Sequence, residues 1–273
     1  MGDSPRRRFY LCPPDYFRIE YSINPWMDVN HQVDSARARE QWASLFETYV
    51  RLGADVHLIE PEPGLPELVF PGDSMFLFRN KAYASRFRHP ERDPEVAQMT
   101  RRFRARGFKV ETLPRALHFE GNAEAIYWNG RLMCGCGIRS DCDVFPILGK
   151  LLNVEIHTFR LTEPYFHFDV TFCGVDKETA VYFPGAFTAG GRELMKRMVP
   201  RLIEADENEA RVLGVNSVSI NGTVVMSTPR APKLAARLRA AGHEVIELDL
   251  SEFYKAGGGA KCLTLESYEY QTP

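Results

Sequence analysis

The sequence predicts an α/β fold built from repeated strand–strand–helix–strand units, which could close around an axis like the blades of a propeller. Three observations lead to this prediction. Helical segments that end at Gly or Asn and run into a short strand recur along the chain. Asn-Gly pairs between short apolar segments mark hairpins, which argues against an all-parallel sheet. No low-complexity linker divides the 273 residues, so we expect a single domain over residues 1–273.

The repeated joint consists of a helical segment, a turn residue and a strand. Gly or Asn after the last helical turn adopts the left-handed conformation that lets the chain reverse. Three copies are clear and the last two are weaker. Written as turn residue and following strand, the copies are Gly53 with 56–59, Gly107 with 108–112, Gly242 with 244–248, Asn153 with 154–159 and Gly214 with 215–220.

Hairpins are expected between these joints. Asn129-Gly130 separates strands at 125–128 and 131–134, and Asn221-Gly222 separates strands at 218–220 and 223–226. Asn-Gly supplies the positive φ angles that a two-residue hairpin turn needs. A looser copy surrounds Arg79-Asn80. Neither G-x-G-x-x-G nor G-x-x-x-x-G-K-[ST] occurs, so a nucleotide-binding function lacks its motif.

The composition is that of an ordinary folded protein, with 44% hydrophobic, 26% charged and 12% aromatic residues. Lys and Arg number 34 and Asp and Glu 36, a net charge of −2, whereas a nucleic-acid-binding domain is usually strongly basic. No apolar run approaches the about 18 residues that span a bilayer. We therefore expect neither nucleic acid nor membrane as a partner, and a homo-oligomer remains open.

The six cysteines are expected to be reduced thiols, because the segment after Arg6-Arg7-Arg8 does not have the pattern of an export signal. Arg6-Arg7-Arg8 is followed by a short segment broken by proline, which is not the apolar part of an export signal. We therefore expect a cytoplasmic protein whose cysteines are reduced thiols. Cys134-Gly135-Cys136 with Cys142 lacks a second C-x₂-C or an H-x₃₋₅-H pair, so a zinc site is disfavoured. The six cysteines are Cys12, Cys134, Cys136, Cys142, Cys173 and Cys262.

Cys262 is the candidate nucleophile. It follows Gly257-Gly258-Gly259, whose backbone freedom allows a close approach to a ligand. Lys261 precedes it and a helix could begin nearby, and either feature would favour the nucleophilic thiolate. A buried structural cysteine after a flexible loop is the alternative that these residues leave open.

His167 lies in the second candidate segment, residues 165–171. In a strand, His167, Asp169 and Thr171 would share a polar face opposite three apolar side chains. A polar row beside core residues indicates a wet cavity, and a solvated strand face is the alternative.

Two acidic turns complete the candidates. Glu120 and Glu124 precede the hairpin at 125–134, where paired carboxylates could bind a cation or exchange protons. Asp73 follows Pro71-Gly72 after an apolar strand. Ordinary solvated turns have the same composition, so neither turn identifies a site alone.

In their order along the chain, these motifs resemble the guanidino-group-modifying superfamily, the penteins. Within it the chain is similar to the dimethylarginine dimethylaminohydrolases and to the arginine dihydrolases and deiminases. The resemblance covers nearly the whole chain and implies a five-module α/β propeller around a pseudo-fivefold axis. The segments that carry it are Pro13-Pro14-Asp15-Tyr16-Phe17, Ile23-Asn24-Pro25-Trp26-Met27, Val69-Phe70 with Asp73, Phe119-Glu120-Gly121 with Glu124, Gly137-Ile138-Arg139-Ser140, His167-Phe168-Asp169 and the Gly-rich stretch before Cys262.

The resemblance implies a catalytic role for three residues. Cys262 would attack the guanidinium carbon and form a covalent amidino-thioether. His167 would protonate the departing amine and then activate water. Glu120 would accept hydrogen bonds from the guanidinium and orient His167. No metal or organic cofactor is required.

The resemblance also implies substrate contacts. Asp73 and Asp169 would clamp guanidinium nitrogens, because a planar cation with several N–H donors suits bidentate carboxylates. Arg139 would hold the substrate's carboxylate by the same fork geometry. The remaining contacts would come from Asn24 and Glu124.

The choice of substrate depends on two segments. Asn24-Pro25-Trp26-Met27 is similar to the arginine dihydrolases, but those enzymes carry Asn where this chain has Asp73. The family's Glu-Gly-Gly-Asp loop is one residue longer here and has Glu124 as its second acid. A carboxylate would face the carbonyl oxygen of a neutral ureido product with like polarity, whereas an amide would donate to it. We therefore predict dimethylarginine as substrate, with citrulline and dimethylamine as products.

Alternatives stay open. An arginine dihydrolase or deiminase would release ornithine or citrulline with ammonia. An amidinotransferase would use the same Cys-His-acid set and pass the amidino group to an amine. A non-catalytic guanidinium-binding protein would have no need of the nucleophile Cys262.

Overall fold

Each hairpin expected from the sequence is present and is extended by a third strand. The computed structural model describes residues 6–269. In the turns, Asn129 and Gly130 have φ angles of 49° and 84°, and Asn221 and Gly222 have 51° and 90°. In both hairpins the second strand also pairs in parallel with the strand that follows the next helix. The local unit is therefore an antiparallel pair with a parallel strand at one side.

The strands of residues 6–269 form three three-stranded sheets and one six-stranded sheet, with the order β2-β1-β15-β3-β4-β5 in the latter. The strands are β1 Arg6–Leu11, β2 Asp55–Leu58, β3 Met75–Phe78, β4 Lys81–Ala84, β5 Lys109–Thr112, β6 Ala125–Trp128, β7 Arg131–Cys136, β8 Ile156–Arg160, β9 Phe172–Gly174, β10 Thr179–Tyr182, β11 Arg201–Glu204, β12 Val218–Ile220, β13 Thr223–Met226, β14 Glu244–Glu247 and β15 Leu265–Glu269.

The helices connect these strands. The α-helices are α1 Ser35–Arg51, α2 Pro71–Ser74, α3 Asp93–Ala105, α4 Gly121–Glu124, α5 Val144–Leu152, α6 Ala189–Met198, α7 Glu207–Arg211, α8 Pro232–Ala240 and α9 Ser251–Tyr254. Short 3₁₀ turns are η1 Pro66–Val69, η2 Pro90–Arg92, η3 Phe168–Val170 and η4 Pro184–Ala186. The apolar strand expected before Asp73 is wrong, because η1 and α2 occupy that segment.

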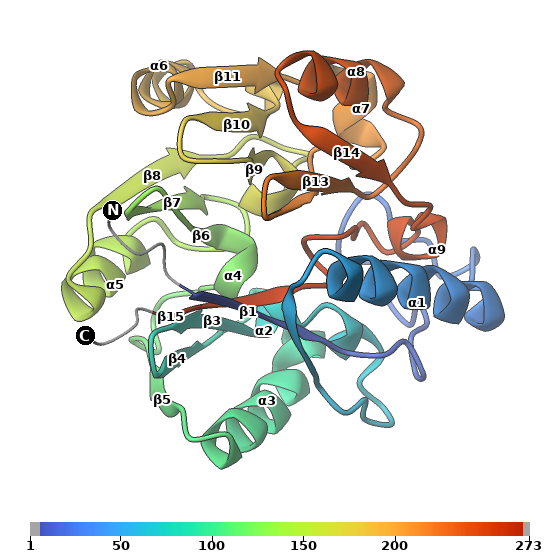
Figure 1. The fold of residues 1–273 in the computed structure, drawn as a ribbon. Coiled ribbons are helices and arrows are strands. Elements are labelled where there is room, and N and C mark those ends of the chain that lie inside the picture. Colours follow the sequence, from blue (N-terminus) through green and yellow to red (C-terminus); the bar gives the residue numbers. More distant parts are fainter. Residues whose placement is uncertain (1–5, 270–273) are drawn as a thin grey trace.

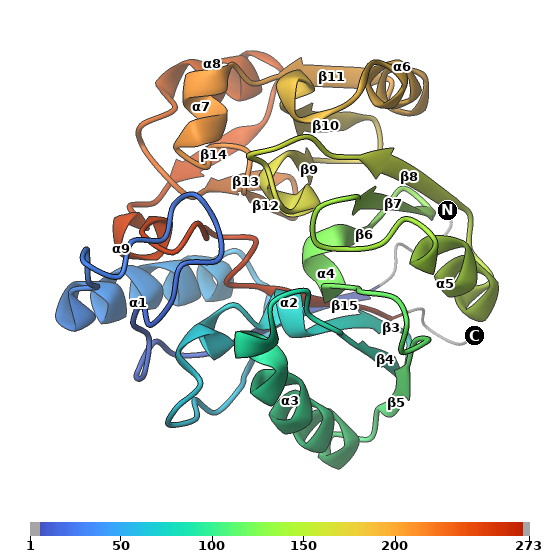
Figure 2. The ribbon, with the colours of Figure 1, turned by 180° about the vertical axis from the view of Figure 1, so that it is seen from behind.

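The six-stranded sheet contains the local unit twice. β1 pairs antiparallel with β15 and parallel with β2, while β4 pairs antiparallel with β3 and parallel with β5. The parallel pairing of β15 with β3 joins the two halves. Figures 1 and 2 show the sheets around the centre of the molecule, with α1, α3, α5, α6 and α8 on the outside.

Four of the five predicted joints are confirmed. Gly53, Gly107, Gly242 and Asn153 have positive φ angles between a helix and a parallel strand. The fifth joint was placed wrongly. The turn after α7 leads into β12, the first strand of a hairpin, and the true fifth copy is α6 followed by β11. That joint needs no glycine, because Val199 precedes Pro200 and takes the extended conformation that proline imposes on its neighbour.

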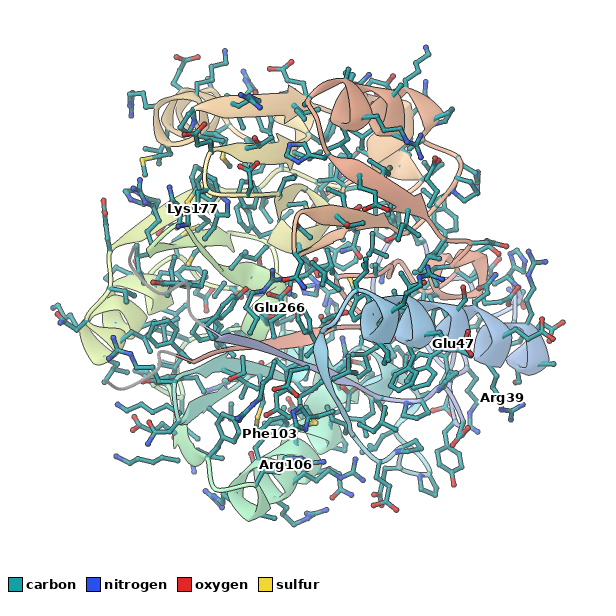
Figure 3. The ribbon with its side chains drawn as sticks, in the orientation of Figure 1. Arg39, Glu47, Phe103, Arg106, Lys177 and Glu266 are labelled. Carbon is teal, nitrogen blue, oxygen red and sulfur yellow. A yellow bond between two sulfur atoms is a disulfide. The ribbon has the colours of Figure 1, made fainter. Side chains whose placement is uncertain are left out.

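The helices pack their apolar faces on the sheets. Asp34 caps α1 by accepting from the backbone of Ala36 and Arg37, and Leu45 and Tyr49 of this helix are fully buried. In Figure 3, Phe103 points from α3 toward the six-stranded sheet, whereas Arg39 lies on the outer side of α1. Within residues 6–269, no helix is long and apolar enough to cross a membrane.

The contact between α2 and α4 provides a test of the fold, because α2 carries Asp73 and α4 begins directly after Glu120. Gly121 has a φ of 58°, and a Cβ there would lie 2.6 Å from the carbonyl oxygens of Gly72 and Met75. We expect Gly121→Ala to lower the free energy of unfolding by about 3 kcal/mol, from backbone strain and overpacking together. Gly130→Ala is the control, because its φ is 84° but no atom lies within 4 Å, so it should cost only about 1 kcal/mol. Equal losses in urea unfolding would contradict this account.

Candidate active site

His167 stands immediately before the 3₁₀ turn η3 rather than in a strand. The backbone N–H of Thr171 donates to the carbonyl of Phe168 at 2.9 Å and closes this turn. The strand interpretation of residues 165–171 is therefore wrong. His167 and Asp169 still reach one site, because both are buried and face Glu120 and Cys262, whereas the Thr171 hydroxyl donates to Phe168.

Glu120 joins His167 to Arg139. Its Oε2 lies 2.7 Å from Nε2 of His167 and 3.0 Å from Nη1 of Arg139, and its Oε1 accepts from the backbone N–H of Arg88. All three side chains are at least 97% buried. Three of the roughly four acceptor positions of the carboxylate are thus occupied, so Glu120 mainly orients the imidazole and guanidinium beside it.

This contact fixes the protonation of the pair. Burial opposes ionisation of Glu120, but Arg139 and His167 together hold the pKa of its carboxyl well below the usual range. Burial lowers the pKa of His167, yet the hydrogen bond to Glu120 and the surrounding carboxylates raise it overall. The pair is therefore an imidazolium and a carboxylate, and Nδ1 of His167 has no partner within the described residues.

Cys262 lies in a tight turn that runs into β15. Leu263 N donates to the carbonyl of Gly259 at 3.0 Å, and no helix begins at the cysteine. The Sγ atom lies 3.2 Å from Oδ2 of Asp169 and 3.2 Å from Nδ2 of Asn216. Sequence reasoning missed Asn216, since an asparagine between a helix and a strand has no distinctive pattern.

The thiol is not activated in the way that the sequence suggested. The ammonium of Lys261 points away from Cys262 and donates to Oδ1 of Asn122 at 2.7 Å. Burial, Asp169 and Asp73 raise the pKa of Cys262 well above its usual range. Cys262 lines a small pocket with Asp73, Arg139 and His167. Without a cation in this pocket, the thiol form of Cys262 is favoured over the thiolate.

Asp73 is held by a buried arginine that the sequence did not indicate. Arg92 donates to Asp73 Oδ2 and forms ion pairs with Glu67 at 3.1 Å and Glu95 at 2.8 Å. Glu67 also lines the pocket, and burial, partly offset by Arg92, raises its pKa to about 7. Arg92 lies in a surface-like run of charged residues and Glu67 in a proline-rich turn, so neither pattern marks a site.

Arg139, Asn24 and Phe166 close the pocket. Arg139 Nη2 donates to the carbonyl of Ile23 at 2.7 Å, and its guanidinium carbon lies 5.0 Å from the ring centre of Phe166. Asn24 Nδ2 donates to the carbonyl of Ala256 at 3.0 Å and so fastens its segment to the Gly-rich loop. The enclosed volume is about 20 Å³, room for about one water, so a substrate must part these walls.

Glu124 does not line this pocket. Its Oε2 accepts from the backbone N–H of Phe168 at 3.1 Å, and burial raises the pKa of Glu124 to about 8. Through this hydrogen bond, Glu124 holds the first residue of the η3 turn, next to His167. Its Oε1 has no partner within residues 6–269, so the contact to substrate that the resemblance implies for Glu124 stays a prediction.

The expectation of six reduced thiols is wrong for one pair. Cys136 and Cys142 form a disulfide, while Cys12, Cys134, Cys173 and Cys262 are free and buried. Gly137, with a φ of 106°, and the hydrogen bond from its N–H to Ser140 O fold the loop back, which leaves the two Cα atoms 5.0 Å apart. The loop closed in this way carries Arg139. A spacing of six residues matches no common pairing pattern, so sequence alone does not reveal it.

A larger cavity of about 420 Å³ lies behind Cys262. The hairpin turns at Asn129 and Lys177 line its mouth, and Lys261 and Glu266 lie at its floor, with Glu266 near the centre of the molecule in Figure 3. The buried charges at the floor of this cavity are paired with each other, because Lys261 and Arg7 both form ion pairs with Glu266. The larger cavity thus lacks the imidazole and carboxylate pair of the small pocket.

Within residues 6–269, no three His, Cys, Asp or Glu side chains are grouped to hold a metal ion.

The small pocket presents unpaired acceptors. Three buried carboxylate oxygens around it have no hydrogen-bond partner within residues 6–269, and neither does the ring nitrogen Nδ1 of His167. The three oxygens are Glu67 Oε1, Asp73 Oδ1 and Asp169 Oδ1. Unpaired buried acceptors are costly, so the arrangement suits a small cation with several N–H groups placed next to Cys262.

The chain is similar to enzymes of arginine metabolism. A family model described as N,N dimethylarginine dimethylhydrolase, eukaryotic, matches residues 14–269. A dimethylarginine dimethylaminohydrolase of Mycobacterium tuberculosis is 36% identical over 265 residues, which are 96% of this chain and 87% of that protein. The bifunctional arginine dihydrolase/ornithine cyclodeaminase AgrE of a Nostoc species is 37% identical over 270 residues, 97% of this chain but only 38% of that protein.

Solved structures agree with these similarities. The N-terminal domain of ArgZ, covalently bound to a reaction intermediate, superposes with a TM-score of 0.92 at 34% identity and covers 98% of this chain and 100% of that one. A dimethylarginine dimethylaminohydrolase adduct with S-methyl-L-thiocitrulline gives a TM-score of 0.81 at 18% identity, covering 95% and 98%. The latter likeness concerns the fold alone.

The Glu120–His167 contact predicts a large effect on the histidine. In Glu120→Gln, burial acts without the opposing carboxylate of Glu120, so the pKa of His167 should fall below that of the wild type. Histidine-selective NMR titration measures this shift. Glu124→Gln is the comparison variant, because Glu124 acts on His167 through its charge but makes no hydrogen bond to it, so this change should lower the pKa of His167 less than Glu120→Gln does. An unchanged pKa in Glu120→Gln would show that the carboxylate does not hold the imidazolium.

Proposed function

Because the chain belongs to the dimethylarginine dimethylaminohydrolase family, whose members hydrolyse C–N bonds of linear amidines, we propose that it converts asymmetric dimethylarginine to citrulline and dimethylamine through Cys262. The observation that carries this proposal is the set of unpaired acceptors around a buried thiol. A guanidinium supplies a positive charge and a plane of N–H donors to these acceptors.

The substrate cation balances the charge of the pocket. Asp73 and Asp169 accept from the guanidinium nitrogens through their unpaired Oδ1 atoms, and the guanidinium carbon then lies against Sγ of Cys262. Burial is the first cause of the raised pKa of the Cys262 thiol, and Asp169 and Asp73 add to it; the substrate charge offsets these two carboxylates and so lowers the pKa of the thiol. Substrate binding and thiolate formation are thus coupled.

The α-carboxylate of the substrate requires a cationic partner, and its α-amino group requires an acceptor. Arg139 retains N–H donors beyond the two that contact Glu120 and Ile23, and these suit the α-carboxylate. Glu67 presents an unpaired Oε1 at the pocket, which suits the α-amino group. Asn24 holds the segment that covers this end.

In the first half-reaction, the thiol proton passes to Asp169 Oδ2, 3.2 Å away, and on to solvent. A sulfur lone pair forms the S–C bond to the guanidinium carbon, and the C=N electrons move to nitrogen. The imidazolium of His167 then protonates the dimethylamino nitrogen, and the C–N bond breaks. Dimethylamine leaves, and an amidino-thioether remains on Cys262.

In the second half-reaction, neutral His167 removes a proton from water, and the oxygen bonds to the amidino carbon. Collapse of this adduct breaks the C–S bond, returns the electron pair to sulfur and releases citrulline after loss of one proton. Glu120 stabilises His167 each time it becomes cationic. One histidine therefore serves as acid and then as base.

Arginine dihydrolysis is the second candidate. The 37% identity to AgrE and the dihydrolase-like segment at Asn24 favour it. AgrE is a bifunctional protein, and this chain spans only 38% of its length. Asp73 favours the single hydrolysis, because a carboxylate repels the ureido oxygen that a second round must bind.

We also propose that the five strand groups are the modules of a propeller closed around a pseudo-fivefold axis, and that residues 1–273 form one catalytic domain. A cytoplasmic location suits an enzyme of free amino acids with four free thiols, and the Cys136–Cys142 disulfide is the feature against it.

The products distinguish the candidates. Incubation with arginine, monomethylarginine and asymmetric dimethylarginine, followed by mass analysis, should give citrulline and dimethylamine from the last substrate. Cys262→Ser should fold but be nearly inactive, whereas Cys134→Ser, which changes a buried free thiol elsewhere, should keep most activity. An added amine acceptor should not change the products. Ornithine and ammonia as main products from arginine would instead establish the dihydrolase.

Asp73 can be tested by one isosteric change. Asp73→Asn removes the charge that clamps the guanidinium, so KM for dimethylarginine should rise about 10–100-fold, corresponding to about 1.5–3 kcal/mol for a charged hydrogen bond. Citrulline should inhibit the variant more strongly than the wild type, since the amide can donate to the ureido oxygen. Glu95→Gln, which also touches Arg92 but does not line the pocket, is the control. An unchanged KM and unchanged citrulline inhibition would exclude this role of Asp73.

A further inference from the structure

We propose that Asn216 is a further catalytic residue, whose side-chain N–H group contacts the sulfur of Cys262 and stabilises it as the thiolate. The proposal rests on the hydrolase function proposed above, in which Cys262 is the nucleophile. Asn216 lies between α7 and β12 and is fully buried. Its side chain therefore meets only protein groups.

The carboxamide of Asn216 makes four contacts to the catalytic segment and its neighbours. Its Nδ2 donates to Sγ of Cys262 at 3.2 Å and to the carbonyl oxygen of Asp169 at 3.1 Å. Its Oδ1 accepts from the backbone N–H groups of Lys261 at 3.1 Å and of Cys262 at 3.3 Å. One side chain thus holds the nucleophile by both its backbone and its sulfur.

These partners determine which end of the amide faces the sulfur. A backbone N–H can only donate and a carbonyl oxygen can only accept. The opposite orientation would place the NH₂ group against two N–H donors and the oxygen against the carbonyl of Asp169. The group that faces Sγ is therefore the NH₂ end, which is a donor.

The Gly-rich loop is shaped around this side chain. A Cβ on Gly259 would collide with the Ser227 hydroxyl and would lie 2.8 Å from Oδ1 of Asn216. Ser227 donates to the carbonyl of Asn216 and accepts from the N–H of Ala260 at 2.7 Å. Asn216 and the loop before Cys262 are thus held as one unit, which explains why a glycine stands at position 259.

The charged groups around the sulfur explain why a hydrogen-bond donor is needed beside it. Asp169 and Asp73 face Sγ and oppose its ionisation, His167 shares the pocket, and the ammonium of Lys261 points away. In the thiol state, S–H donates to Asp169 and the Asn216 N–H meets a weak acceptor. In the thiolate state, the same N–H makes a charge-assisted hydrogen bond. The contact is therefore strongest when the sulfur carries the charge needed for attack.

Asn216→Asp removes the donor and keeps an oxygen that accepts from Lys261 and Cys262, but it also adds a carboxylate beside the sulfur. Asn216→Ser, which removes the amide donor without adding charge, is therefore measured alongside it. We expect the pH midpoint of thiolate formation at Cys262 to rise by about one pH unit or more, and alkylation by iodoacetamide below that midpoint to slow about tenfold. The ultraviolet absorbance of the thiolate, corrected with Cys262→Ser, gives the midpoint. With substrate, kcat should fall more than KM rises.

Asn122→Asp is the matched control. Asn122 is also fully buried, and its Oδ1 accepts from Lys261 Nζ and from Glu266 N, on the other side of the Lys261–Cys262 peptide. It should leave the thiolate midpoint nearly unchanged. If Asn216→Asp has the wild-type midpoint and alkylation rate, or if both variants shift the midpoint equally, the assignment of Asn216 is wrong.

Two further measurements keep the test decisive. Asn216→Ser, which is smaller and brings no charge, must also show an upward shift, and a wild-type midpoint in it would overturn the proposal. Alkylation requires no substrate. A shifted midpoint in a protein that hydrolyses no guanidino compound would therefore support Asn216 and refute the proposed function, whereas normal hydrolysis with an unshifted midpoint would do the reverse.

Discussion

An excess of buried carboxyl groups over buried cations shapes the site of this protein. Around the small pocket, the carboxyl groups are Glu67, Asp73, Glu95, Glu120 and Asp169, and the facing cations are Arg92, Arg139 and the imidazolium of His167. Burying unpaired charge is costly, so the missing cation is the natural ligand of such a site. Burial and two of these carboxylates, Asp169 and Asp73, raise the pKa of the Cys262 thiol. In the function proposed above, selectivity for a guanidinium and activation of Cys262 therefore have a common origin.

The peptide between Lys261 and Cys262 separates two compartments. Lys261 points to the larger cavity, where it meets Glu266 and Asn122, and Cys262 points to the small pocket with Asp169. Since β15 follows directly and pairs with β1 and β3, Cys262 is attached to the sheet that contains the first and the last described strands. The position of Cys262 therefore depends on long-range strand pairing as well as on the loop that Asn216 and Ser227 hold.

The sequence predicted those parts that leave a local pattern. The Asn-Gly hairpins and four of the five joints follow from residues that accept positive φ, and Cys262, His167 and Glu120 lie in motifs with a known order. The fifth joint was misplaced because no glycine marks it. Pro200 imposes the extended conformation on Val199 and so ends α6, whereas Gly or Asn follows the helix at the other joints. Arg92 and Asn216 lack a local pattern, because their roles arise from contacts with residues 19 and 46 positions away. The pairing of Cys136 with Cys142 likewise depends on how the loop folds.

The most direct test of this account is the covalent state of Cys262 during turnover. Enzyme mixed with excess asymmetric dimethylarginine, quenched in acid and digested should yield a Cys262 peptide heavier by the mass of the substrate less dimethylamine. That adduct should disappear when the substrate is exhausted. Turnover with an unmodified Cys262 peptide, or an adduct confined to another cysteine, would contradict the proposed attack of this thiol on a guanidinium carbon.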